Sequence, residues 1–153
     1  GEQDRIFRLI PALKQADFVR YGVMHRNTYI NSPQMLKPAL QCKNRENIFF
    51  AGQITGVEGY MESAATGIIA GINIVNLLKG KEPLVLSEDT MLGALIQFIT
   101  SASQENFQPM NANFGLLPPL EKAVKNKAKR YEAYCERALT NIMKYSELFI
   151  ELL

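Results

Sequence analysis

The segment Ile48–Gly71, IFFAGQITGVEGYMESAATGIIAG, decides the fold expected for this chain. Its first four residues are apolar and rich in strand formers, so they predict a short buried strand. Three glycines then let the backbone adopt left-handed or crowded conformations that a Cβ atom would forbid. They are Gly52, Gly56 and Gly59. From about Tyr60 the sequence predicts a helix that runs to about Lys79, with Gly80 as its carboxyl-terminal cap.

This strand–turn–helix unit has two interpretations. A glycine turn that leads into a helix exposes free backbone N–H groups and the positive end of the helix dipole, which suits an anionic or polar ligand group. Small residues also give the helix a thin face on which a flat ligand or another backbone can lie close. They are Ala64, Ala65, Gly67, Ala70 and Gly71. The unit is therefore either a cofactor cradle or a tightly packed corner, and no G-x-G-x-x-G pattern in the chain decides between them.

Composition sets broad limits on fold and partners. The chain has 153 residues, 47% hydrophobic and 21% charged, which is typical of one soluble globular domain. A net charge of +2 does not by itself imply a polyanionic partner. No apolar run approaches the length of a membrane span, so we expect no membrane association. The chain opens at Gly1, which indicates a cut inside a larger protein or removal of an initiator Met.

Cysteine and histidine are scarce. Cys42 and Cys135 lack metal-ligand spacing, and the chain has one histidine, so we predict no metal site. Cys135 is interpreted as a small core residue. Unpaired cysteines favour a reduced, cytoplasmic setting.

Further elements follow from local patterns. Residues 2–10 predict an amphipathic helix and residues 18–31 an extended segment. Residues 40–43 predict a short strand. Ser87 has the character of a helix cap, and residues 101–119 predict a long irregular segment that is packed down.

The last segment, from about Leu120, predicts a helix with a heptad seam. Such a seam indicates a coiled-coil partner surface or, more simply, a helix packed on its own domain. The start of this helix carries a basic run that suits phosphate groups, although a solvated helix face would look the same. The run comprises Lys122, Lys125, Lys127, Lys129 and Arg130.

Two polar features have ligand-binding chemistry. In His25-Arg26-Asn27, the histidine ring can titrate or stack on a flat ligand and the arginine can bind a carboxylate or phosphate. Tyr60 could stack on an aromatic cofactor at the start of the helix. A structural histidine and an ordinary amphipathic tyrosine are the alternatives.

Three segments together resemble the carboxyl-terminal part of the TrmFO family, formerly called Gid. They are FVRYGVMHRNTYINSP, IFFAGQITGVEGYMESAATGIIAGIN and FQPMNANFGLLPP. TrmFO proteins are bacterial folate- and FAD-dependent tRNA (uracil-54-C5)-methyltransferases. A similar glycine turn occurs in a related flavoprotein that modifies the wobble uridine of tRNA, but the first and third segments favour TrmFO.

The resemblance implies an α/β fold. It would comprise the carboxyl-terminal portion of a Rossmann-like FAD-binding domain, the end of an inserted domain, and a long carboxyl-terminal helix. Residues 1–31 would end the insertion and return to the FAD domain. Residues 32–80 would form the strand–glycine turn–helix of that domain, and residues 81–153 a helical region packed on it.

The resemblance also implies chemistry and site residues. Reduced FAD takes a one-carbon unit from methylenetetrahydrofolate, NAD(P)H supplies reducing equivalents, and the carbon passes to C5 of the T-loop uridine. The implied FAD-binding residues are Gly52, Gln53, Gly56, Gly59, Tyr60 and Met61. The implied folate-binding residues are His25, which would stack on the pterin, and its neighbours Arg26 and Asn27.

The chain also departs from the family pattern. The dinucleotide fingerprint and the segments with the catalytic cysteines are absent, so we predict no catalytic residue here. We expect the isolated chain to be inactive and to self-associate through an unpaired strand edge. The alternative from another class is a non-catalytic RNA- or protein-interaction module built on the basic, heptad-patterned tail.

Overall fold

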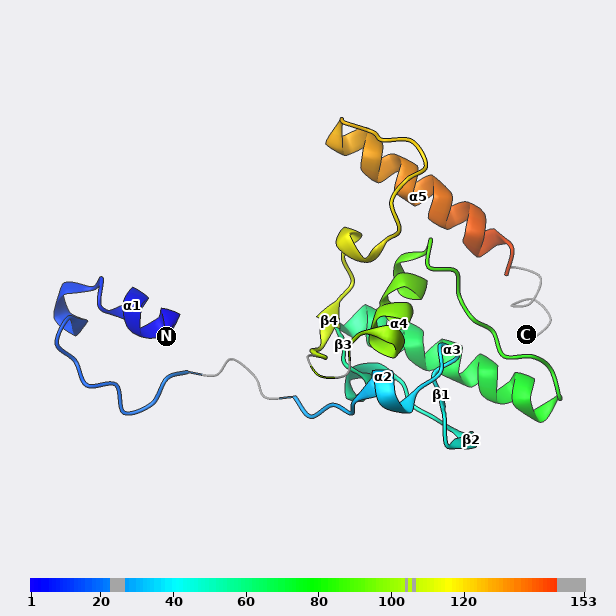
Figure 1. Cartoon of the computed structure of the whole chain (residues 1–153), viewed down its shortest axis with the longest axis horizontal. Helices are drawn as coiled ribbons and strands as arrows, with labels where there is room; N and C mark the ends of the chain where they lie inside the picture. Colours follow the sequence, from blue (N-terminus) through cyan, green and yellow to red (C-terminus); the bar gives the residue numbers. More distant parts are fainter. Residues whose placement is uncertain (23–26, 104, 106, 146–153) are drawn as a thin grey trace.

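A computed structural model describes residues 1–22, 27–103, 105 and 107–145 (Figure 1). The α/β class is confirmed as a combination of helices with small sheets. The elements are α1 (Glu2–Phe7), η1 (Pro11–Leu13), α2 (Ser32–Met35), β1 (Gln41–Cys42), β2 (Arg45–Phe49), η2 (Gly52–Thr55), β3 (Val57–Glu58), α3 (Tyr60–Leu78), α4 (Met91–Ser101), β4 (Met110–Asn111), η3 (Phe114–Leu116) and α5 (Lys127–Met143).

The strands form two small sheets of different type. β1 and β2 are an antiparallel pair, in agreement with the predicted short strand at residues 40–43. β3 and β4 are a parallel pair, with Val57 opposite Met110. Because parallel strands need a long crossover, α3 and α4 lie between them in the chain.

The strand predicted at Ile48–Ala51 differs from the structure. β2 begins at Arg45 and ends at Phe49, and its residues are exposed or half-buried rather than buried. The physical reason is that β2 has one hydrogen-bonded neighbour, β1, so its apolar residues are not enclosed by further strands.

α3 follows its prediction closely. It begins at Tyr60 and ends at Leu78. Gly80 has a φ of +63°, and its N–H donates to the Leu77 carbonyl at 3.1 Å while the Lys81 N–H donates to the Asn76 carbonyl at 2.8 Å. These two bonds form a Schellman motif, so the predicted glycine cap is confirmed.

The core lies where α3 and α4 pack against the parallel strand pair. Its buried apolar residues include Leu40, Val57, Ile69, Leu95, Ile99 and Phe107. Asn73 of α3 is buried among them, and its side chain bonds to Leu84 N and O and to Ala39 O at 2.6–3.0 Å. One residue therefore ties α3 to the segment before β1 and to the segment that follows α3.

By length and composition alone, α3 could cross a membrane, which contradicts the expectation that no apolar run is so long. The core helix of a protein passes the same test. The buried face of α3 includes Thr66, Asn73 and Asn76, each a polar side chain inside the protein. One face of α3 thus packs in the core, and 33% of its most apolar 18-residue window is buried.

The first 22 residues lie apart from the rest in Figure 1. α1 ends at Phe7, earlier than the predicted residue 10. The described parts of the predicted extended segment, residues 18–22 and 27–31, contain no strand. A strand needs a paired neighbouring strand. Residues 18–22 instead pack against α1, where the ring centroids of Phe18 and Phe7 are 5.6 Å apart.

The carboxyl-terminal third differs from prediction in its helix boundaries. α4 is capped by Thr90, whose Oγ1 accepts from Gly93 N at 3.0 Å, whereas Ser87 caps only the preceding turn. α5 begins at Lys127 rather than near Leu120. The prediction of Cys135 as a core residue is wrong, because its side chain is exposed.

No residue of α5 is buried, but two residues of the predicted heptad seam make packing contacts: Tyr131 stacks on Phe114 and Tyr145 packs against the core. Polar contacts also hold the helix. Arg137 donates to the Pro118 and Pro119 carbonyls and pairs with Asp89 at 3.2 Å. The Tyr145 hydroxyl accepts from Ser87 N at 3.0 Å.

Candidate functional site

The candidate site lies at the amino-terminal end of α3, where the glycine turn enters the helix. η2, β3 and the first turn of α3 follow one another between Gly52 and Ser63, separated only by Gly56 and Gly59. Thr66 fixes this turn from inside α3, because its Oγ1 accepts from Gly52 N at 2.9 Å and donates to Ser63 O at 2.8 Å. Thr55 Oγ1 donates to Gly52 O at 2.7 Å, which closes η2 on itself.

Two of the glycines have positive φ angles and close neighbours. Gly56 has a φ of +86°, and a Cβ there would lie 2.6 Å from Cζ of Phe107. Gly59 has a φ of +102°, and a Cβ there would overlap the carboxylate of Glu62. Gly56 therefore makes room for a core ring, whereas at Gly59 the positive φ is what favours glycine, because the Glu62 carboxylate can move.

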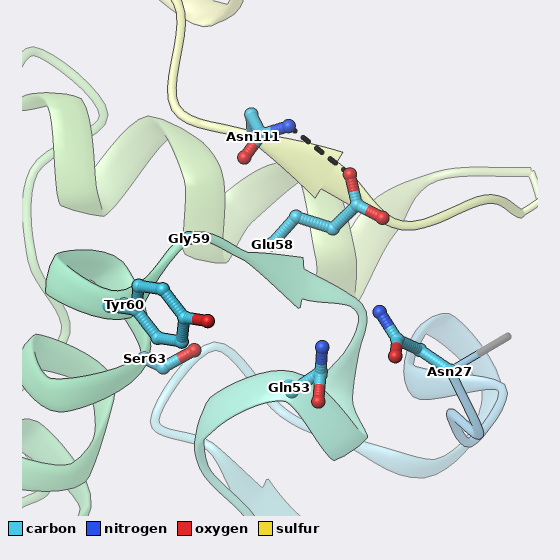
Figure 2. A pocket seen from close by; sticks show the side chains of 7 residues that line it. All are labelled: Asn27, Gln53, Glu58, Gly59, Tyr60, Ser63 and Asn111. Atoms are coloured by element: carbon cyan, nitrogen blue, oxygen red, sulfur yellow. Dashed lines mark hydrogen bonds between the residues drawn. The ribbon is translucent and has the colours of Figure 1, made fainter. Parts of the chain in front are cut away.

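A pocket of about 600 Å³ opens at this point. Figure 2 shows that its lining comes from four parts of the chain: the segment before α2, the η2–β3 turn, the start of α3, and β4. The lining residues are Asn27, Gln53, Glu58, Gly59, Tyr60, Ser63 and Asn111. Apart from Gly59, each has a polar side chain, so the pocket offers hydrogen-bond donors and acceptors on several sides.

The pocket brings together the three segments on which the resemblance rests. Met110 N donates to Gly56 O at 2.9 Å, and Asn111 Nδ2 donates to Glu58 Oε2 at 3.1 Å (Figure 2). From the first segment, Ile30 N donates to Ile54 O at 2.9 Å. Segments separated by tens of residues in the sequence thus form one structural unit.

The predicted FAD-binding residues divide into two groups. Gln53, Gly59 and Tyr60 line the pocket, and the Tyr60 side chain is 96% exposed. Gly52, Gly56 and Met61 are not among the lining residues, and Met61 is 82% exposed. Of the predicted folate-binding residues, Asn27 lines the same pocket, whereas His25 and Arg26 lie outside the described residues.

Three lining residues were not predicted: Glu58, Ser63 and Asn111. Glu58 and Asn111 lie inside the GVEGY and FQPMNANFG motifs, which is the signal that could have found them. Their proximity depends on the parallel β3–β4 pairing, a non-local contact that periodicity does not reveal.

Comparison with known proteins identifies the family. A family model described as glucose inhibited division protein A, GidA, matches residues 1–82, more than half of the chain. This chain belongs to the GidA family.

Several relatives of this GidA-family chain carry one name, methylenetetrahydrofolate–tRNA-(uracil-5-)-methyltransferase TrmFO. The protein from Syntrophomonas wolfei is 69% identical over 147 residues, which cover 96% of this chain and 34% of that protein. The protein from an Exiguobacterium species is 59% identical over 150 residues, which cover 97% of this chain and 34% of that protein. The predicted resemblance to TrmFO is confirmed, and the chain spans about a third of the length of these relatives.

A solved structure of GidA from Aquifex aeolicus also matches. It is 40% identical, with a TM-score of 0.43, over 44% of this chain and 11% of that one.

Proposed function

We propose that this GidA-family chain is the carboxyl-terminal part of a methylenetetrahydrofolate–tRNA-(uracil-5-)-methyltransferase and that it forms one wall of the FAD site. The observation that carries the proposal is the 69% identity with a protein of that name over nearly the whole chain. The polar pocket at the start of α3 supports it, because it lies where the resemblance puts the flavin.

The residues present fit a flavin. A cavity of about 600 Å³ is within the range of small-molecule sites. The first N–H groups of α3 have no intrahelical partner, and Gly59 presents no side chain beside them. Gln53 and Asn27 add amide groups on the opposite side of the pocket (Figure 2). Gly56 does not line the pocket, and an added Cβ there would meet the Phe107 ring.

Within the proposed site, this chain's own residues bind and orient. The positive end of the α3 dipole stabilises negative charge at the polar edge of a bound ring. Tyr60, at the pocket edge, offers a ring for stacking. When bound, reduced FAD would supply the carrier for the one-carbon unit of methylenetetrahydrofolate.

The finer assignments follow from the resemblance. Residues 32–80 belong to a Rossmann-like FAD-binding domain, residues 1–31 end an inserted domain, and residues 81–153 pack on the FAD domain. The folate approaches from the side of Asn27, with His25 stacked on the pterin and Arg26 nearby. NAD(P)H is the reductant, tRNA the substrate and the cytoplasm the compartment. The isolated chain is inactive and self-associates.

A chimera tests this proposal. In the Syntrophomonas wolfei relative, the aligned third is replaced by this chain, and flavin absorption and 5-methyluridine formation in tRNA are measured. We expect a yellow protein that forms 5-methyluridine with methylenetetrahydrofolate and NADPH. A folded chimera without flavin and without methyl transfer would refute the proposal.

Two variants of the chimera test the site. Gly59→Ala introduces a Cβ at a positive φ beside the pocket, so we expect loss of flavin absorption. The matched control is Gly67→Ala, because a Cβ at Gly67 meets nothing within 4 Å. His25→Ala should weaken use of the folate while flavin absorption stays unchanged; unaltered methyl transfer would contradict the folate assignment.

A further inference from the structure

The amino-terminal end of α5 and the segment just before it carry a group of cations that the proposed FAD site does not use. They are Lys122, Lys125, Lys127, Lys129 and Arg130, and we call them, with the aromatic pair Phe114 and Tyr131, the α5 basic surface. We propose that the α5 basic surface binds the phosphate backbone of the tRNA substrate. This inference rests on the proposed function, because it takes the substrate class from there.

The charges of this surface are available to a partner. The four lysines are exposed and Arg130 is half-buried. Within the described part of the chain, none of the five pairs with a carboxylate. Arg137, farther along α5, provides the contrast: it is bound by Asp89 and two proline carbonyls, so it anchors the helix and belongs to no open surface.

The position of the cations works against the stability of the helix. Asn126 caps α5, and the first turn contains Lys127, Lys129 and Arg130 with no acidic residue. The positive end of a helix dipole disfavours cations in the first turn, where carboxylates are usual. Positive side chains and the positive dipole end therefore reinforce each other at one point, and an anionic partner would relieve this repulsion.

Aromatic rings lie among the cations. The Phe114 and Tyr131 rings stack with centroids 4.2 Å apart and an interplanar angle of 12°. Lys127 Nζ lies 5.6 Å and Arg130 Cζ 6.0 Å from the centroid of the Tyr131 ring. Phe114 remains 36% exposed, so it can take part in stacking on an unpaired base while the neighbouring cations contact phosphates.

The α5 basic surface lies close to the candidate site along the chain. Asn111 lines the pocket, and Phe114 follows three residues later. Three residues span at most about 11 Å, so the edge of the surface is within that distance of the pocket wall. In Figure 1 the chain rises from β4 through η3 toward α5. A polynucleotide with its target base at the pocket would reach the surface within a few nucleotides.

The observations favour RNA over a membrane. A basic amphipathic helix that lies on a membrane needs an apolar face beside its cations. The exposed large apolar residues of α5 lie toward the other end of the helix; they are Leu139, Ile142 and Met143. Cations interleaved with aromatic rings are instead typical of nucleic-acid surfaces.

The test measures tRNA binding by the whole 153-residue chain as a function of salt. In the triple variant Lys125→Ala, Lys127→Ala and Lys129→Ala, we expect at least about tenfold weaker binding of an unmodified tRNA transcript. The magnitude of the slope of log K, the tRNA association constant, against log salt concentration should fall by about two to three. Each lost phosphate contact lowers that slope by somewhat less than one unit. The matched control replaces three exposed cations elsewhere in the chain by alanine: Lys14, Arg45 and Lys79. It should leave the tRNA affinity and the salt slope nearly unchanged.

Three results would overturn the inference. They are a triple variant that binds tRNA like the unsubstituted chain, equal losses in the test and control variants, and an unsubstituted chain that binds phosphatidylserine vesicles but not tRNA. None of these readouts depends on flavin or methyl transfer, so they are separate from the chimera that tests the proposed function. A chimera without methyl transfer whose tRNA binding still depends on the three lysines would refute the function and leave the RNA surface intact.

Discussion

Replacing Gly56 by alanine tests whether a packing contact, rather than a ligand, requires glycine at this position. Gly56 has a φ of +86°, and an added Cβ would lie 2.6 Å from Cζ of Phe107. An alanine in the left-handed region costs about 1–2 kcal/mol, and forcing an extra carbon into a packed core costs about 1–3 kcal/mol. We therefore expect Gly56→Ala to lower the free energy of unfolding by about 2–5 kcal/mol.

The assay is urea denaturation followed by far-ultraviolet circular dichroism. The matched control is Gly67→Ala, the same chemical change at a helical position where the new Cβ meets nothing within 4 Å. In the helix interior, alanine is favoured over glycine by about 0.5–1 kcal/mol, so this control should raise the free energy of unfolding. One substitution type thus gives effects of opposite sign at two positions.

A second variant identifies the contact responsible. Phe107→Leu shortens the ring side chain that faces Gly56, so the double variant should lose less stability than the sum of the two single losses. A coupling of about 1 kcal/mol or more is expected, since the clash is shared by both residues. Strictly additive losses, or a Gly56→Ala variant as stable as the wild type, would refute the packing explanation.

Four further predictions concern stability and association. Asn73→Leu removes three buried hydrogen bonds and should lower the free energy of unfolding, measured by urea denaturation, by about 2–4 kcal/mol. A loss no larger than that of a typical surface substitution would contradict the role of Asn73 in holding α3 in place. Thr90→Ala should cost about 1–2 kcal/mol and Ser87→Ala clearly less, because Thr90 caps α4; the reverse order would restore the cap predicted from sequence. Hydrogen bonds from Tyr21 and Arg8 lower the pKa of Asp4, so this contact stabilises the first 22 residues above the ordinary aspartate pKa and is lost as the pH falls through the lowered value. Ring NMR signals of Tyr21 should report that transition, and Tyr21→Phe should move the Asp4 midpoint upward. The isolated chain should sediment with a concentration-dependent mass, because α3 and the edge of β2 expose apolar and unpaired groups; a strict monomer at high concentration counts against this.

Local signals in the sequence were sufficient for α3 and its cap. A glycine that ends a helix depends only on local backbone geometry. The capping hydrogen bonds at Gly80 join residues no more than five positions apart. The cap of α4 was misjudged because Ser87 and Thr90 are both suitable, and the choice depends on which hydroxyl reaches a free N–H once the helix packs.

The candidate site was predictable in part for a similar reason. Gly59 and Tyr60 belong to the strand–turn–helix pattern and Gln53 was implied by the family resemblance; all three lie in one continuous stretch of sequence and line the pocket. Glu58 and Asn111 meet only because β3 pairs with β4 across more than fifty residues, and no periodicity records such a pairing. For Gly56, the sequence does not say what the missing Cβ makes room for, whereas the structure shows the Phe107 ring beside that position.

The sequence by itself determined the family, the existence of α3, and the glycine turn that leads into it, since these depend on residue identity and short-range backbone geometry. Only the tertiary structure decided which glycine serves packing, which polar groups share one pocket, and that the α5 cations lie beside stacked rings near its edge. The physical reason is that each of these depends on contacts between segments far apart in the chain, and such contacts form only when the core between α3 and α4 brings those segments together.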